Sequence, residues 1–283
     1  MYREDYLIYK SEDKKVLISC ENKLIESFTI PPQVKYIESG AFKNCHLLKT
    51  LDFGTGFYLE ELNEDAFPEP SIEKIFPSER LNNINPSDFR NAVNIENLKS
   101  VTVRKEHSSF DFSIHFFTHI GEYGKVLFGC NLEEINFEGI INSCFSIDGV
   151  WYSKAEDCPS IVLYPPAKKD KKFIMPNEIQ KTYYYTIAGN PYLETLVLHK
   201  NFEFENNMVI NCTSLKSIYI DNYKLDFGEF TNCPNLKYII CNSDFVMTDR
   251  CKEAVSKQGL IVGKKGDIIN TAKTFKEINE LYK

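Results

Sequence analysis

Apolar residues recur along this chain in a fixed local order: an aliphatic anchor is followed three residues later by a second aliphatic residue, and often two residues after that by a third. The fullest copies, which begin with an Asn-Cys pair, occupy 44–53, 211–220 and 232–241. Weaker copies occupy 72–75, 98–103, 130–137 and 190–198. The anchors are Leu48, Ile72, Leu98, Leu132, Leu193, Leu215 and Leu236.

These anchors are separated by 24, 26, 34, 61, 22 and 21 residues, so most intervals match one solenoid unit and the longer ones predict insertions. Each copy ends in alternating apolar and outward positions, which is typical of a short strand with one buried face. A single unit cannot bury that face alone. Stacking would place the strands in parallel and join their inward side chains into one core. The pattern therefore predicts a repeat solenoid.

The residues before the first copy add further landmarks. Segment 29–45 reads Thr-Ile-Pro-Pro-Gln-Val-Lys-Tyr-Ile-Glu-Ser-Gly-Ala-Phe-Lys-Asn-Cys, and we expect Ala66-Phe67 and Asp88-Phe89 to occupy the Ala-Phe place in the next two units. This pattern closely resembles the BspA-type leucine-rich repeat, over roughly residues 24–242. The resemblance implies a β-rich α/β, right-handed leucine-rich-repeat array with a concave parallel sheet. It also implies a non-enzymatic role in adhesion or protein binding.

The predicted organisation has three parts. Residues 1–23 form an N-terminal hairpin cap, built on a hairpin at 6–18. Residues 24–246 form the solenoid, with an irregular or inserted segment at about 104–173 that contains a second hairpin at 150–164. Residues 247–283 form a helical C-terminal cap. Its first helix is bounded by Thr248 as N-cap and Gly259 as terminator, and a second helix is expected at 271–282.

Charge and cysteine content exclude several classes of protein. The net charge of −7 argues against general electrostatic binding to nucleic-acid phosphates, so no nucleic-acid partner is expected. No apolar run approaches the roughly 18 residues that would span a bilayer, which predicts no membrane insertion. The N-terminus does not resemble a signal peptide, and nine cysteines is an odd number without a Cys-x-x-Cys pair. Both observations favour a cytoplasmic protein, with the cell surface as the alternative that the family resemblance suggests.

Nothing in the sequence argues for catalysis, and we expect no enzyme activity, cofactor or metal. Four cysteines share one repeat position, which packing explains: Cys45, Cys130, Cys212 and Cys233. The other five lack an adjacent His or metal-site spacing. His115 and His119 have the i, i+4 spacing of helical metal ligands but lack the Glu of a zincin motif. A carbohydrate-binding or enzymatic site in 99–173, where the repeat is least regular, remains an alternative.

The side chains that point away from the core make the candidate binding surface. If Leu51 and Phe53 face inward, Asp52 faces outward on the concave sheet, and the same position can be followed from unit to unit. Exposed aromatic residues beside polar groups are typical of protein-binding hot spots. The candidate residues are Asp52, Phe76, Thr102, Asn136, Val197, His199, Tyr219, Asp221, Tyr238 and Ile240.

These features predict a non-enzymatic scaffold whose partner is another protein, with a host or extracellular protein as one candidate. A cell-surface adhesin or antigen is the alternative. The competing interpretation of the C-terminal candidate residues is that the C-terminal cap or the segment 138–173 folds over them.

Overall fold

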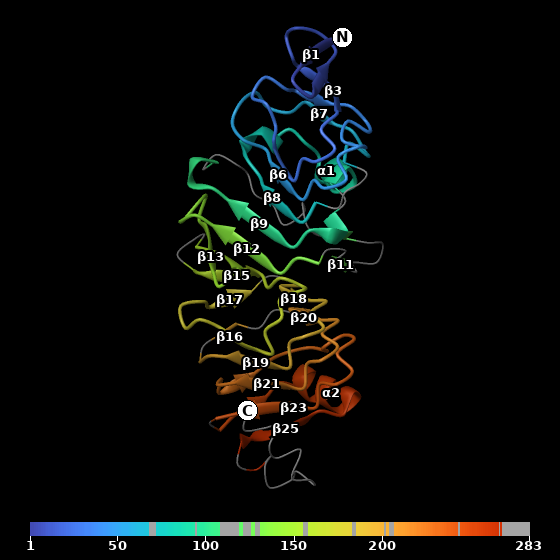
Figure 1. The fold of residues 1–283 in the computed structure, drawn as a ribbon. Helices are drawn as coiled ribbons and strands as arrows, with labels where there is room; N and C mark the ends of the chain where they lie inside the picture. Colours follow the sequence, from blue (N-terminus) through green and yellow to red (C-terminus); the bar gives the residue numbers. More distant parts are fainter. Residues whose placement is uncertain are drawn as a thin grey trace. The chain divides into compact units, whose positions relative to one another are not determined.

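The computed structural model describes residues 1–67, 72–93, 95–107, 131–154, 158–182, 185–200, 202–203, 207–242, 244–265 and 267, and the backbone of 119–120 and 126–127. The chain divides into two compact units. The first comprises Met1–Ser153 with Pro165–Ala167, and the second comprises Lys154–Tyr164 with Lys168–Lys283. Each unit contains its own stack of short parallel strands (Figure 1).

The first unit is built around five parallel strands in the order β12-β9-β8-β6-β4. Their bounds are β4 (Ser27–Thr29), β6 (Thr50–Asp52), β8 (Lys74–Phe76), β9 (Ser100–Val103) and β12 (Glu134–Phe137). The register aligns one buried residue from every strand, namely Phe28, Leu51, Ile75, Val101 and Ile135. The anchors Leu48, Ile72, Leu98 and Leu132 each lie two residues before a strand and are fully buried. The repeat therefore forms one continuous core in this unit.

A second sheet of the first unit has the order β1-β2-β3-β5-β7. Its strands are β1 (Tyr2–Glu4), β2 (Leu7–Tyr9), β3 (Val16–Cys20), β5 (Tyr36–Ile37) and β7 (Glu61–Leu62). Strands β2 and β3 are antiparallel and form the hairpin that the sequence predicts at 6–18. From β3 onward the pairing is parallel, so the N-terminal hairpin adds directly to the repeat coils.

The position of the Ala-Phe landmark in the third repeat was predicted wrongly. Phe42 N–H donates to the Ala66 carbonyl at 3.1 Å, and Phe67 N–H donates to the Ala92 carbonyl at 3.3 Å. Ala92-Val93 therefore occupies the place expected for Asp88-Phe89. The error is about one helical turn, because helix α1 (Pro86–Val93) places Phe89 and Val93 on the same buried side.

The first unit also contains an antiparallel hairpin of β13 (Cys144–Ile147) and β14 (Val150–Ser153). Asp148 and Gly149 connect the strands, and both have positive φ, 49° and 74°, as a two-residue type I′ turn requires. A Cβ on Gly149 would lie 2.8 Å from Glu134 Cβ, so only glycine allows this close approach to β12. The remaining short elements are η1 (Glu79–Leu81), η2 (Ile95–Asn97), η3 (Lys105–His107), β10 (His119–Ile120) and β11 (Val126–Leu127).

Arg80, in η1, is fully buried and joins two coils of the first unit. Its guanidinium group donates five hydrogen bonds of 2.6 to 3.2 Å to the main-chain carbonyls of Ile30, Pro31, Val34, Phe53 and Phe57. Burial lowers the pKa of Arg80 to about 10, so the side chain remains charged at neutral pH. The loops of these coils are thus held by a single cation.

The second unit has five parallel strands in the order β16-β19-β21-β23-β25. Their bounds are β16 (Lys172–Ile174), β19 (Thr195–Leu198), β21 (Ser217–Ile220), β23 (Tyr238–Cys241) and β25 (Ile261–Lys264). The aligned inward column is Phe173, Leu196, Ile218, Ile239 and Val262. Strand β16 shows that the repeat resumes inside the segment predicted as an insertion, and β25 continues the sheet beyond residue 246.

The other elements of the second unit are short. They are β15 (Ser160–Leu163) with β17 (Lys181–Thr182), β18 (Ile187–Ala188) with β20 (Val209–Ile210), and β22 (Lys224–Leu225) with β24 (Val246–Met247), all in parallel pairs. Strands β14 and β15 lie at the two apolar runs of the predicted hairpin at 150–164.

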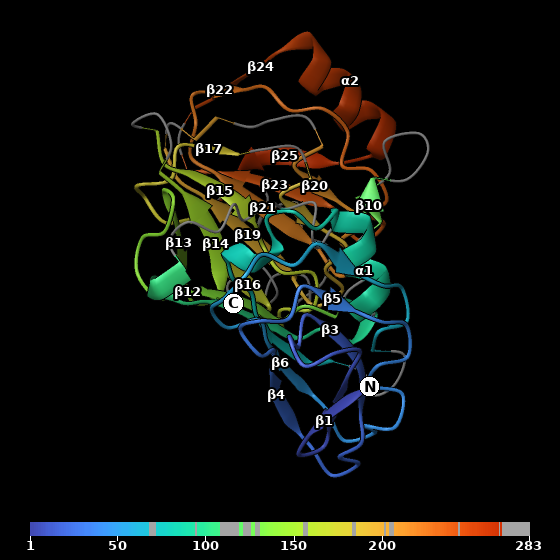
Figure 2. The same cartoon turned by 90° about the horizontal axis from the view of Figure 1, so that it is seen from above.

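Helix α2 (Asp249–Gln258) begins directly after β24 (Figure 2). The Thr248 hydroxyl accepts a hydrogen bond from Cys251 N–H at 3.3 Å, and Gly259 has a left-handed φ of 64°. These are the two signals that predicted the helix, an N-cap acceptor and a glycine terminator. The second expected helix, at 271–282, lies outside the described residues.

Candidate interaction surfaces

Each parallel sheet has an outward face, formed by the residues that alternate with its buried column. On the first outward face, Asp52 lies opposite Phe76, and Thr102 lies opposite Asn136. On the second outward face, Ile174, Val197, Tyr219 and Ile240 form one column. The register therefore aligns the candidate residues as the sequence predicts, although the two faces have different chemistry.

Phe76 is the centre of the first outward face. Arg104 Cζ lies 4.1 Å from the Phe76 ring centroid, and Lys74 Nζ lies 4.8 Å from it, so two cations contact one ring. The Arg104 guanidinium also donates to Asp52 Oδ2 at 2.8 Å, while Asp52 Oδ1 accepts from Gly54 N–H at 2.9 Å. The Asp52 side chain is only 12% exposed. It is therefore an anchor that holds Arg104 over Phe76, and not a free carboxylate.

The sequence did not identify Arg104 or Lys74 as members of this surface. Lys74 could have been found, because it is two residues from Phe76 on the same strand and so shares its face. Arg104 follows β9 and reaches across the sheet to β6, which strand alternation does not indicate. Thr102 and Asn136 are half-buried beside this cluster.

The second outward face changes from exposed to buried along the sheet. Ile174 is 59% exposed, Val197 and Tyr219 are half-buried, and Ile240 is 1% exposed. Tyr238 is 8% exposed and forms a buried cluster with Ile240, against which Tyr219 packs. Burial raises the pKa of the Tyr219 phenol. The accessible apolar surface of this column is thus provided by Ile174, Val197 and Tyr219.

His199 and Asp221, the first residues after β19 and β21, are partly buried. Both His199 ring nitrogens contact main-chain oxygens, with Nδ1 2.7 Å from the Lys200 carbonyl and Nε2 facing the Ile179 carbonyl. The imidazole also packs edge-on against Phe202. His199 is therefore engaged within its own unit.

Three of the four repeat cysteines, Cys45, Cys212 and Cys233, are buried thiols. Cys45 Sγ lies 3.6 Å from the Cys20 carbonyl oxygen, and burial raises the pKa of Cys45 to about 12. The contact between the Cys212 and Cys233 thiols raises the pKa of Cys212 and lowers that of Cys233. Cys45 and Cys212 therefore remain protonated and are weak nucleophiles. Cys130 and His115 lie outside the described residues, and His119 is described only in its backbone.

Within the described part of the chain, no group of three or more His, Cys, Asp or Glu residues could hold a metal ion. No helix in that part is both long enough and apolar enough to cross a membrane.

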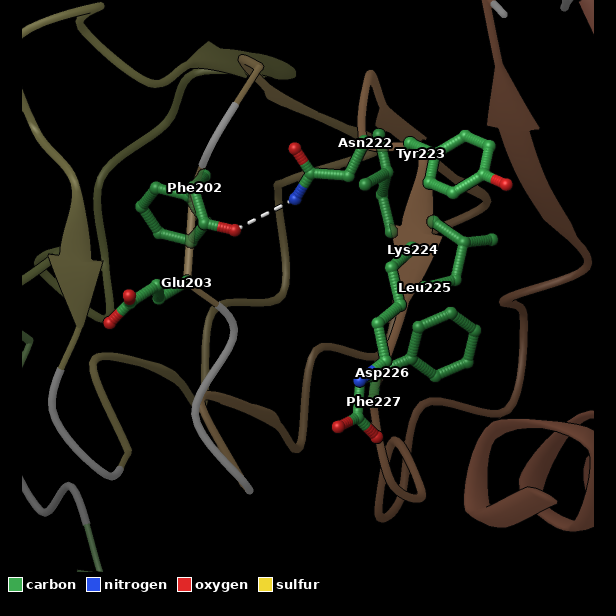
Figure 3. Close-up of a pocket in the computed structure, with 9 residues that line it drawn as sticks. Phe202, Glu203, Asn222, Tyr223, Lys224, Leu225, Asp226 and Phe227 are labelled. Atoms are coloured by element: carbon green, nitrogen blue, oxygen red, sulfur yellow. Dashed lines mark hydrogen bonds between the residues drawn. The ribbon is translucent and has the colours of Figure 1, made fainter. Parts of the chain in front are cut away.

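A pocket of about 580 Å³ lies in the second unit, and Ile220 at the end of β21 contributes to its lining. One wall is formed by Phe202 and Glu203, and the other by residues 222–227, which include β22 (Figure 3). The Asn222 amide donates to the Phe202 carbonyl at 2.8 Å and joins the two walls. The sequence did not indicate this pocket.

Stacked parallel coils with one aliphatic anchor per turn define a repeat protein of the leucine-rich class. The model of the BspA type leucine rich repeat region matches residues 18–148 and 167–251 in six copies. The chain belongs to this family, which confirms the resemblance seen in the sequence.

Solved structures with a similar course of the chain come from bacterial leucine-rich repeat proteins. A leucine rich cell surface protein from Faecalibacterium prausnitzii has 20% sequence identity and a TM-score of 0.40, and the match covers 81% of this chain and 51% of that one. A leucine-rich repeat protein from Eubacterium ventriosum has 13% identity and a TM-score of 0.38, covering 85% and 66% respectively. The pneumococcal vaccine antigen PcpA has 15% identity and a TM-score of 0.33, covering 91% and 80%. This chain thus spans less than two thirds of the first two proteins. None of the curated proteins matches it.

Proposed function

We propose that this protein is a non-enzymatic interaction module that binds another protein through the outward faces of its two sheets. The observation that carries the proposal is the cluster on the first outward face, where Asp52 holds Arg104 over Phe76. An aromatic ring and an arginine fixed in this way lose little freedom on binding, and both residue types are enriched in hot spots. Family membership supports the same role.

A cell-surface adhesin or antigen is the more specific form of this proposal. The Faecalibacterium protein is described as a cell surface protein and PcpA as a vaccine antigen. A host or extracellular protein would then be the partner. The exposed Ile174 and the half-buried Val197 and Tyr219 of the second outward face would add apolar contact area to such an interface.

The test is a binding screen against an array of purified extracellular proteins. Two variants alter the outward faces, Phe76→Ser with Arg104→Ala in the first and Tyr219→Ser in the second. The matched control is Tyr58→Ser, because Tyr58 is 51% exposed but lies outside both faces. We expect the face variants to lower binding of a captured protein by about 30-fold, the effect of losing a hot-spot contact, and the control to bind as the wild type does. A partner whose binding both face variants leave unchanged would refute the proposal.

A further inference from the structure

In the second unit, hydrogen bonds between successive short coil segments follow a constant offset. Glu203 N–H donates to the Gln180 carbonyl at 2.9 Å. Two segments further along, Thr248 N–H donates to the Leu225 carbonyl at 3.1 Å. Both bonds join residues 23 positions apart. Between the two intervening segments, 202–203 and 223–226, no main-chain hydrogen bond joins the described residues.

One edge of β22 has no paired strand among the described residues. Within the described chain, β22 pairs only with β24, through which the Leu225 main chain is bonded. Successive residues of a parallel strand direct their main-chain groups to opposite sides. The N–H and carbonyl groups of Lys224 and the N–H of Asp226 therefore face the pocket. An open strand edge of this kind is a template for pairing with another segment.

The pocket lies beside this unpaired edge of β22. Phe202 and Glu203 form the wall across from β22, and the Asn222 amide bonds to the Phe202 carbonyl (Figure 3). Phe202 and Leu225 are buried in the walls, whereas Tyr223 is 72% exposed at the rim. The volume of about 580 Å³ is within the range of sites that hold a short ligand segment.

Three charged side chains line the pocket, and the Glu203 carboxylate lies 4.0 Å from Lys181 on the wall across from β22. The Asp226 carboxylate already accepts from the Thr248 hydroxyl at 2.8 Å and faces Arg250 at 3.3 Å. Lys224 is exposed, and its ammonium group makes no ion pair with any described residue. An acidic side chain directly across from Lys224 on an added strand would form a favourable cross-strand pair.

We propose that an extended peptide segment with an acidic side chain opposite Lys224 binds in this pocket by adding to the open edge of β22. Main-chain bonds to Lys224 and Asp226 supply the pairing, and the acidic residue fixes the register. This site is separate from the two outward faces, so it does not depend on the function proposed for them.

The probe is a phage-displayed library of random nine-residue peptides selected on the intact protein. Lys224→Pro removes the pocket-facing N–H and blocks the edge, while Leu225 N–H, which serves β24, is retained. Lys224→Gln removes only the charge, and Lys252→Gln on α2 is the matched control. We expect selected peptides to share one Asp or Glu position. Their affinity should fall at least tenfold in Lys224→Pro, three- to tenfold in Lys224→Gln, and less than twofold in the control.

A ligand-side measurement keeps the test valid if Lys224→Pro does not fold. N-methylation of a selected peptide at every second residue removes the main-chain N–H groups on one side of the bound strand. Methylation of the residues that face β22 should abolish binding, whereas methylation of the other residues should leave binding unchanged. Equal effects at every position would overturn the proposal, as would peptides that bind Lys224→Pro normally or share no acidic position. Binding of oligosaccharides that depends on Tyr223, without any selected peptide, would also overturn it. Self-association of the chain that Lys224→Pro abolishes would assign the edge to a second copy instead.

Discussion

The outward faces of the two sheets occupy the same place in the repeat but are stabilised by different interactions. In the first unit, an ion pair between Asp52 and Arg104 lies over Phe76. In the second unit, the equivalent column passes from the exposed Ile174 to the buried Ile240 and is apolar throughout. The register fixes where these side chains point, whereas residue type alone decides what they can bind.

The two units also differ in the buried side chains that hold their coils together. Arg80 bonds five carbonyls of the first unit. In the described part of the second unit, the large side chains that are fully buried are aromatic, and they include Phe227 and Phe230 with ring centroids 5.2 Å apart. A buried cation depends on every acceptor being in place, because each lost partner leaves a costly polar group. The first unit should therefore be sensitive to changes in charge, and the second to changes in apolar volume.

The largest effect is expected for Arg80→Met. The substitution fills similar space but removes the arginine donor from five carbonyls, and three of the lost bonds, to Ile30, Phe53 and Val34, are buried. We therefore expect unfolding of the first unit to become easier by about 3 to 5 kcal/mol. Urea unfolding followed by the fluorescence of Trp151 measures this, because Trp151 is the single tryptophan and is buried in the first unit.

The matched control for Arg80→Met is Arg3→Met, because the Arg3 side chain is 60% exposed and its ion pair with Glu21 should contribute less than about 1 kcal/mol. A loss below about 1 kcal/mol for Arg80→Met would show that the carbonyls find other donors. The contrast between a charge-held and an apolar unit would then be wrong.

A smaller effect is expected for Asp52→Asn. The amide keeps the shape of the side chain and can still accept from Gly54 N–H, so the main loss is the charge that holds Arg104. We expect a stability loss of about 1 to 2 kcal/mol, which 1 M NaCl should reduce because salt already weakens the ion pair in the wild type. Val197→Thr on the second face is the control, and its effect should not decrease with salt. Equal salt responses of both variants would remove the distinction between the faces.

The sequence predicted the core, since every anchor from Leu48 to Leu236 is buried two residues before a strand. A period is a strong signal because many coils must obey it together. The Asp148-Gly149 turn could also have been predicted, because Asp-Gly between two β-rich runs is a hairpin signal. The positions of individual motif residues within one coil were harder to predict. Helix α1 moved the Ala-Phe position by a turn, because a helix can present two apolar residues to the same core.

Contacts that cross several coils could not be predicted. Arg80 bonds carbonyls up to 50 residues away, and Arg104 reaches Asp52 across 52 residues. Both separations are close to two repeat lengths, but the period does not indicate which charged side chain turns toward another coil, and both side chains would normally be assigned to solvent. The burial of Ile240 was likewise open, since alternation gives the face of a residue but not its exposure. The sequence therefore predicted where the candidate residues lie on the strands, including Asp52, but missed the basic residues Lys74 and Arg104.

The smallest expected effect concerns a feature that both units share. Glu73 bridges Lys49 and Lys99 on neighbouring coils of the first unit, and Glu194 bridges Lys171 and Lys216 in the second. Hydrogen bonds from Lys99 and then Lys49 lower the pKa of Glu73, and those from Lys216 and then Lys171 lower the pKa of Glu194. If the difference between the units is confined to the faces and the buried loops, these two ladders should respond alike.

We expect Glu73→Gln and Glu194→Gln each to reduce stability by about 0.5 kcal/mol at pH 7, because these partly exposed bridges are screened by solvent. A lowered pKa in the folded protein means that the carboxylate stabilises it above the ordinary value of 4.5, and that this contribution disappears as the pH falls from about 4.5 through the lowered pKa. Urea titrations of both variants and the wild type from pH 7 to pH 3 measure the difference. Convergence with the wild type in one unit but not in the other would show that the contrast between the units extends to their surfaces.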